Sequence, residues 1–247
     1  MGSFYVLDNN SRRVFLKFMQ ETESYPQEDV IKALVGFLEA DEAITRWKAM
    51  RFLIYLKYRD SQVIWDFWYQ EPEWIYRQIV LEAVDNLPIE EAVQLLVDVA
   101  KFDDNDRNRH DALNKLGNYV NTETRQQIMS AYLDSLFDVG SWSRRAALEQ
   151  LLRLKATEAL PYAPSMLLSD EDSQVRVAAS EYLAELGSLE TYEYVISAYA
   201  REQINQYVFV RITEKYVERF GEDAVTTKIS NISDVNEREK IEEALRE

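Results

Sequence analysis

The pattern that decides the fold is clearest in residues 158–187, which read EALPYAPSMLLSDEDSQVRVAASEYLAELG. Two apolar stretches lie on either side of an acidic turn, and Arg176 opens the second stretch. The same position recurs every 31 to 35 residues, with a tyrosine as the last and weakest match: Arg46, Arg77, Arg109, Arg144, Arg176 and Tyr207. A fixed period in this range is typical of helix pairs that bury their apolar faces only by stacking on neighbours.

Apolar positions repeat together with the arginine. Three residues downstream lie Ala49, Val80, Ala112, Ala147 and Ala179, and seven downstream lie Leu53, Val84, Leu116, Leu151 and Leu183. Offsets 0, 3, 4 and 7 share one face of a helix, so this stripe predicts a buried face. A small residue at offset three allows close helix approach, and overpacking there would cost about 1–3 kcal/mol.

Another apolar helix is expected before each helix that carries the arginine and the apolar stripe. The predicted first helices are 28–39, 61–70, 89–101, 122–137, 157–168 and 189–201. Pro161 and Pro164 lie inside the fifth of them, where the proline ring should bend or restart the helix. The sequence therefore predicts an all-α, right-handed α-solenoid of about six helical hairpins.

The predicted domain organisation is one solenoid domain over residues 1–247. Residues 1–27 would hold an N-terminal capping helix, with Val14, Phe15, Phe18 and Met19 on its apolar side. The repeats would occupy residues 28–221, and residues 222–247 would form a C-terminal capping segment. Solenoids need such caps because an uncovered end repeat exposes its stacking face.

The clearest unit resembles the bacterial HEAT-like repeat found in phycobilisome-lyase-type proteins. The residues that match are Asp172, Val175, Arg176, Ala179, Leu183 and Gly187. The other units keep the arginine and the small and large apolar positions but lose the valine. The resemblance implies a fold and a binding role, because that family has mixed functions.

Charge and composition exclude several functional classes. The chain has 28 basic and 44 acidic residues, a net charge of −16, so its mean field repels nucleic acid and anionic membranes. A basic partner is favoured, although the same excess of carboxylates could simply keep the surface soluble. The chain has no cysteine, no apolar run of membrane-spanning length and no basic leader, so a cytoplasmic protein is expected.

A catalytic or metal site is not expected. The single histidine, His110, would have to serve any Ser-His-Asp triad, and its position predicts a surface residue instead. No phosphate-binding glycine loop or paired-cysteine motif is present. The prediction is therefore a protein that is not an enzyme and holds no cofactor or metal.

The recurring arginines, which we call the arginine ladder (Arg46, Arg77, Arg109, Arg144 and Arg176), allow two interpretations. They could bind an anion, or each guanidinium could bind a turn carboxylate of its own or the next repeat. An acid does lie four or five residues before most of them, which favours the structural role. The fourth unit has Gly140 at that place, so Arg144 or Arg145 could be free for a ligand.

The candidate binding surface is the face of each second helix that carries offsets one, five and nine from the ladder position. We add Trp74, which follows a turn at Pro72, and call the set the second-helix row: Trp47, Arg51, Tyr55, Trp74, Gln78, Glu82, Asn86, His110, Asn114, Asn118, Arg145, Glu149, Arg153, Glu181 and Glu185. Such a mixed polar face suits recognition of a protein, although any solvated helix face is polar too. Four of the five tryptophans lie in the first two repeats, where they could be an interface or core packing.

The function predicted from these features is a non-enzymatic protein-binding module or scaffold with a basic protein partner. Two other hypotheses stay open. The acidic charge would also suit an inhibitor or immunity-type protein that neutralises a basic toxin, and the repeat resemblance implies a bilin lyase-type subunit as an alternative.

Overall fold

The computed structural model describes residues 17, 18 and 20–246 of the chain, and every regular element within them is a helix. Residues 17, 18 and 20–22 are helical. The remainder of the predicted N-terminal capping helix, including Val14, Phe15 and Met19, lies outside the described residues.

The chain divides into two compact units between Leu95 and Leu96, and each is described by itself. The boundary falls inside helix α7 (Ile89–Phe102). The single-domain organisation and its boundaries stay predictions.

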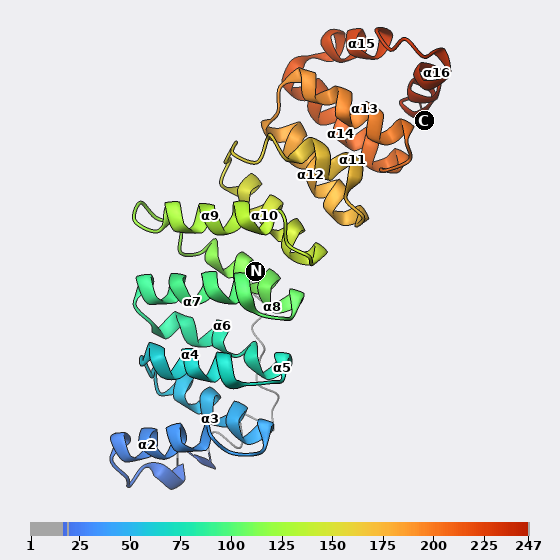
Figure 1. Cartoon of the computed structure of the whole chain (residues 1–247). Helices are drawn as coiled ribbons and strands as arrows, with labels where there is room; N and C mark the ends of the chain where they lie inside the picture. The colour runs from blue at the N-terminus through green and yellow to red at the C-terminus, as the bar shows by residue number, and fades with distance from the viewer. Residues whose placement is uncertain (1–16, 19, 247) are drawn as a thin grey trace. The chain divides into compact units, whose positions relative to one another are not determined.

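The first unit contains α2 (Gln27–Phe37), α3 (Ala43–Tyr55), α4 (Ser61–Gln70), α5 (Trp74–Arg77), α6 (Val80–Ala83), the 3-10 turn η1 (Val84–Asn86) and the start of α7. Helix α2 packs on α3, α3 contacts α5, and α4 contacts α6 (Figure 1). Leu34 of α2 meets Ala49 and Leu53 of α3 in a small core. The second repeat has its second helix broken into α5, α6 and η1, where the sequence pattern predicts one continuous helix.

The second unit contains the end of α7, then α8 (Asp106–Leu116), α9 (Arg125–Ser135), α10 (Ser141–Arg153), α11 (Ala163–Ser169), α12 (Ser173–Leu186), η2 (Leu189–Thr191), α13 (Tyr192–Ala200), α14 (Gln206–Phe220), α15 (Glu222–Ser230) and α16 (Val235–Ala244). Helices α9 and α10, α11 and α12, and α13 and α14 form antiparallel pairs (Figure 1). The second helices contact one another in order, α8 to α10, α10 to α12 and α12 to α14. This stacking of hairpins confirms the predicted all-α solenoid class.

The apolar rungs predicted from the period are the core of these stacks. Ala112, Ala147 and Ala179 at offset three have no exposed surface, nor do Leu116 and Leu151 at offset seven. Their burial confirms the buried face that the 0, 3, 4, 7 stripe predicts. The proline prediction is also confirmed, because α11 begins only at Ala163 with Pro164 in its first turn, where no N–H is needed.

In the last repeat, the structure places the ladder position at a different residue from the one that the sequence pattern selected. Each ladder arginine is the fourth residue of its helix, and the fourth residue of α14 is Phe209. Phe209 is fully buried, whereas Tyr207 is 75% exposed. The match at Tyr207 was therefore wrong by two residues, because the unit has no arginine to mark the position.

The C-terminal segment is a pair of helices. Helix α15 packs on α14, and α16 packs on both α13 and α15. The Gln206 side chain donates to the Ala244 carbonyl over 3.2 Å and joins the end of α16 to the start of α14. Ile241 and Ala244 of α16 are buried, so the segment covers apolar surface of the last hairpin.

Candidate functional site

Each ladder arginine binds the turn that precedes its own helix. The Nη1 group of Arg144 donates to the carbonyls of Asp138 and Val139 over 2.9 and 3.1 Å. Arg46, Arg77 and Arg176 donate in the same way to the carbonyls five and six residues before them, and Arg109 donates to the Asp103 carbonyl. These carbonyls follow the end of the first helix, so one guanidinium closes each hairpin turn.

The other edge of the guanidinium binds the next repeat. Arg46 holds Glu71 with two hydrogen bonds of 2.8 and 3.0 Å. Arg109 holds Asp138 over 2.9 and 2.6 Å, and Arg144 holds Asp170 over 2.8 and 2.7 Å. Arg176 donates instead to the Gln203 carbonyl over 2.7 Å. Two parallel bonds to a carboxylate are the strong geometry for arginine, and they connect successive hairpins.

The ladder is a structural feature, and its partners differ in position from those predicted. The bound carboxylate lies six residues before the next ladder arginine, not four or five. The prediction that Arg144 could be free was wrong, since both edges of its guanidinium are occupied. The hydrogen bonds to Asp170 and the carboxylate charge raise the pKa of Arg144 although burial opposes them. The acid of the next repeat was one of the two partners that the sequence allowed, but it lies six residues before the next arginine, outside the spacing of four or five that the sequence pattern indicated.

In the first unit, the second-helix row brings Trp47, Arg51 and Glu82 together. The guanidinium of Arg51 lies 4.9 Å from the centre of the Trp47 ring, and its Nη1 is 3.5 Å from Glu82. Arg51 is only 8% exposed, whereas the sequence predicted a surface position. It therefore packs against Trp47 and Glu82 and is not itself an exposed part of the row. The Trp47 ring also lies 6.4 Å from that of Tyr76. Tyr55, by contrast, is exposed at the end of α3.

The remaining row residues of this unit have varied roles. Asn86 donates to the Ile54 carbonyl over 3.0 Å and so ties η1 to the end of α3. Trp74 begins α5, and Trp74 and Gln78 are half-buried. Phe67 and Trp68 are buried, which supports core packing for part of the tryptophan cluster, and the edge of Trp68 meets Trp65.

In the second unit, one chain of hydrogen bonds runs through the row. Gln150 donates to Asn114 over 2.8 Å, Asn114 lies 3.1 Å from Nε2 of His110, and Nδ1 of His110 lies 2.8 Å from Asp111. The network assigns the His110 proton to Nδ1, because Nε2 faces an amide that donates. His110 is half-buried and lies between Asp111 and Asn114, whereas the sequence predicted an exposed side chain.

The later row residues pair within their own helix or with a neighbouring one. Arg153 donates to the Gly117 carbonyl over 2.8 Å, next to the exposed Asn118. Arg145 pairs with Glu149 over 3.4 Å along α10. Glu181 binds Arg211, and Glu185 binds Lys215, each over 2.5 Å, so α14 neutralises the carboxylates that α12 contributes.

One set of exposed residues was missed by the sequence analysis. The second residue of most second helices is a large apolar side chain that lies outside the buried stripe: Ile44, Ile75, Trp142 and Tyr207. On α8 this place is taken by Arg107, which is exposed. The signal was a bulky apolar residue two places before the fourth position of most of these helices, which the 0, 3, 4, 7 pattern leaves unexplained.

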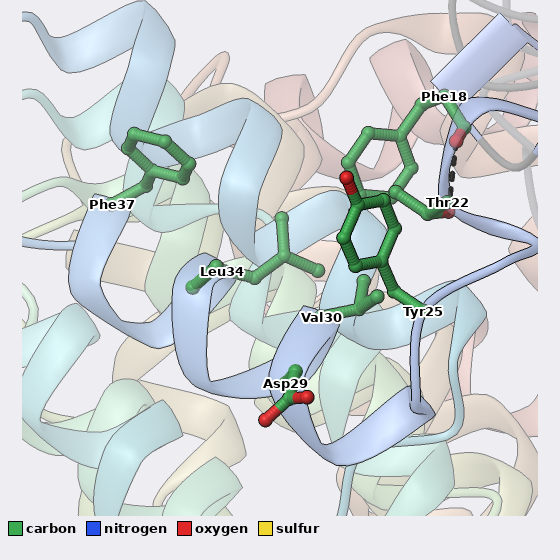
Figure 2. Close-up of a pocket in the computed structure, with 8 residues that line it drawn as sticks. Phe18, Thr22, Tyr25, Asp29, Val30, Leu34 and Phe37 are labelled. Atoms are coloured by element: carbon green, nitrogen blue, oxygen red, sulfur yellow. Dashed lines mark hydrogen bonds between the residues drawn. The ribbon is translucent and has the colours of Figure 1, made fainter.

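A pocket of about 200 Å³ lies in the first unit between α2 and the side chains of Phe18, Thr22 and Tyr25. Its lining is mostly apolar, with Phe18 and Tyr25 at one end and Phe37 at the other (Figure 2). Thr22 donates to the Phe18 carbonyl over 2.8 Å, and the Phe18 ring stacks on Phe52 at 4.5 Å. The lining adjoins residue 19, which lies outside the described residues, so we assign no ligand to this pocket.

Residues 17, 18 and 20–246 show neither a metal site nor a membrane-spanning helix. They hold no cluster of three His, Asp or Glu residues arranged to bind a metal ion. None of the helices formed by these residues is long and apolar enough to cross a membrane.

The stacked hairpins, tied by the arginine ladder, define a helical repeat protein. No family model matches the chain, and no curated protein matches it. Solved structures that resemble it include an engineered protein at 17% identity and TM-score 0.42, covering 88% of this chain and 96% of that one. YibA of Escherichia coli has 13% identity and TM-score 0.39, with 94% and 96% coverage. A designed armadillo repeat protein for modular peptide recognition has 15% identity and TM-score 0.37, with 87% and 98% coverage. At these scores the likenesses carry no argument about function.

Proposed function

We propose that this chain is a non-enzymatic module that binds another protein through its second-helix row. The observation that carries the proposal is the partial exposure of aromatic side chains on the row helices. Trp47 is half-buried and Tyr55 is exposed on α3, in a repeat whose core is already filled by Ala49, Met50 and Leu53. Aromatic residues that are not needed for packing are the type that dominates protein interfaces.

The partner is expected to be basic, because both units carry a net negative charge. Residues 1–95 have ten basic and sixteen acidic residues, and residues 96–247 have eighteen and twenty-eight. Such a field speeds the approach of a positively charged protein and makes the association rate sensitive to salt. We also propose that the repeats are of the HEAT-like type that the sequence resembles. The inhibitor and bilin-lyase hypotheses stay predictions, since no observation favours either of them.

The test is a quantitative capture experiment from cells that express the protein. Wild type, the double variant Trp47→Ala with Tyr55→Ala, and a control variant Tyr69→Ala are compared for the proteins that they retain. Tyr69 is 81% exposed but lies on a first helix, so it controls for loss of any surface aromatic. A partner that is kept by the control and lost by the double variant supports the proposal. Retention of the same proteins by all three would contradict it.

A further inference from the structure

Positive charge is concentrated in one part of this acidic chain. Residues 106–155, which include α8, α9 and α10, hold eight basic and six acidic residues. Residues 156–247 hold nine basic and nineteen acidic ones. At physiological salt the Debye length is about 8 Å, so a ligand on α8 and α10 responds to nearby charges more than to the net charge.

Two arginines of this region flank an exposed indole. The Arg107 guanidinium lies 5.9 Å from the centre of the Trp142 ring, and Trp142 is 46% exposed. The His110 ring meets the same indole edge-on, with 5.8 Å between the ring centres. Arg145 lies one turn beyond Trp142 on α10. We call Arg107, His110, Trp142 and Arg145 the α8–α10 patch.

The α8–α10 patch is held rigidly. The Trp142 backbone N–H donates to the Asp106 carboxylate over 3.1 Å, which fixes the first turn of α10 beside α8. His110 is held between Asp111 and Asn114, as described above. Binding to pre-positioned side chains avoids part of the entropic cost of association.

Neither arginine of the α8–α10 patch is paired with a buried carboxylate. Arg107 makes no ion pair with any residue that the structure describes, and Arg145 pairs only with Glu149, whose side chain is 49% exposed. The Nε group of Arg145 is buried and lies 3.4 Å from Oε1 of Glu149, so a ligand would have to bind the Nη groups. The acids nearby are already engaged, since Asp106 binds the start of α10 and Asp111 binds His110. Arginine binds carboxylates in a two-pronged geometry, so this surface suits an acidic ligand.

We propose that the α8–α10 patch docks an acidic segment of a partner protein. Carboxylates of that segment bind Arg107 and Arg145, and an apolar side chain packs on Trp142. This inference rests on the proposed protein-binding function and specifies its chemistry at one place, where two arginines flank an exposed indole.

The direct test uses two labelled peptides, one built of Glu, Leu and Gly and one with Lys in place of Glu, at physiological salt. The full-length chain should bind the acidic peptide more tightly than the basic one. The double variant Arg107→Gln with Arg145→Gln should bind the acidic peptide about tenfold or more weakly, and so should Trp142→Ala. Arg201→Ala removes an exposed arginine elsewhere in the same unit and should leave affinity unchanged. Circular dichroism of each variant verifies its folding.

Several outcomes would overturn the proposal: no preference for the acidic peptide, an equal loss in Arg201→Ala, or self-association of the chain that the double variant abolishes. A captured partner separates the two proposals. If Trp47 and Tyr55 variants lose it while the Arg107 and Arg145 variant keeps it, the binding function stands and the acidic-segment proposal fails. If the acidic peptide depends on the patch but no partner depends on Trp47 and Tyr55, the proposed function fails in its present form.

Discussion

The arginine of each repeat is needed for its geometry as much as for its charge. A planar guanidinium with five N–H groups can bind two carbonyls with one edge and a carboxylate with the other. Arg144 does both at once, between the turn at Asp138 and the carboxylate of Asp170. An ammonium group has three donors on a flexible stem and cannot cover both sides, so lysine would not replace it.

Replacement of Arg144 by lysine is therefore expected to be costly. The variant Arg144→Lys leaves at least one turn carbonyl or one Asp170 oxygen without a donor in a site where both side chains are nearly buried. We expect the free energy of unfolding to fall by about 1–3 kcal/mol, measured by chemical denaturation. Arg145→Lys is the matched control, because its partner Glu149 is exposed, and it should change stability by less than about 0.5 kcal/mol. Equal effects of the two variants would contradict the structural role of the ladder.

At the level of the helix, α10 is capped by a residue of another helix. Gly140 occupies the N-cap position and provides no side chain. The Asp106 carboxylate from the start of α8 accepts hydrogen bonds from the N–H groups of Trp142 and Ser143 over 3.1 and 3.0 Å, and from the Ser143 hydroxyl over 2.5 Å. A carboxylate here also interacts favourably with the positive end of the helix dipole. Glycine is required because the incoming carboxylate fills the space of its side chain.

A methyl group at Gly140 should displace this cap. A Cβ atom there would lie 2.1 Å from the Asp106 side-chain carbon, although the backbone conformation suits any residue. We expect Gly140→Ala to lower the free energy of unfolding, measured by thermal denaturation, by about 1–2 kcal/mol because the cap is lost. Gly36→Ala, where a Cβ meets nothing within 4 Å inside α2, should instead stabilise by about 0.4–1 kcal/mol. A stabilised Gly140→Ala would show that the cap is not needed.

At the scale of the molecule, the second unit buries several tyrosine hydroxyls. Tyr132, Tyr182, Tyr192 and Tyr216 are all fully buried. Tyr132 donates to the Leu113 carbonyl, and Tyr192 and Tyr216 pair with Thr213 and Thr191. Burial disfavours the phenolate and raises the pKa of Tyr182 and of Tyr216 to about 12. The hydroxyls bind only while they are in their neutral form.

Stability should consequently fall at alkaline pH. An unfolded tyrosine loses its proton near pH 10, whereas the folded Tyr182 and Tyr216 keep theirs to about pH 12, so this stabilisation is complete below pH 10. As the pH rises from 10 to 12, each should contribute a loss of roughly 1–2 kcal/mol, measured by denaturation at several pH values. In a spectroscopic titration, Tyr182→Phe should remove a phenolate signal that appears near pH 12. Early titration of Tyr182 in the folded protein would contradict the buried assignment.

Much of the fold could be predicted because its information is local. The 0, 3, 4, 7 stripe behind each arginine depends on helical geometry alone, and the alanines and leucines it selected, such as Ala147 and Leu151, are buried as expected. Pro164 likewise marks a helix start by its own chemistry. The sequence by itself therefore determined the helical class, the repeat and its buried residues.

Only the tertiary structure decided which polar groups are paired. Arg144 binds Asp170 across 26 residues of chain, and Asp106 caps α10 across 36 or 37, so both pairings depend on contact between neighbouring repeats. The burial of Arg51 and the stacking of Arg107 on Trp142 likewise depend on a neighbouring helix. Hydrophobic periodicity is a property of one helix, whereas hydrogen bonds and ion pairs between repeats require atoms of two helices to lie within about 3 Å.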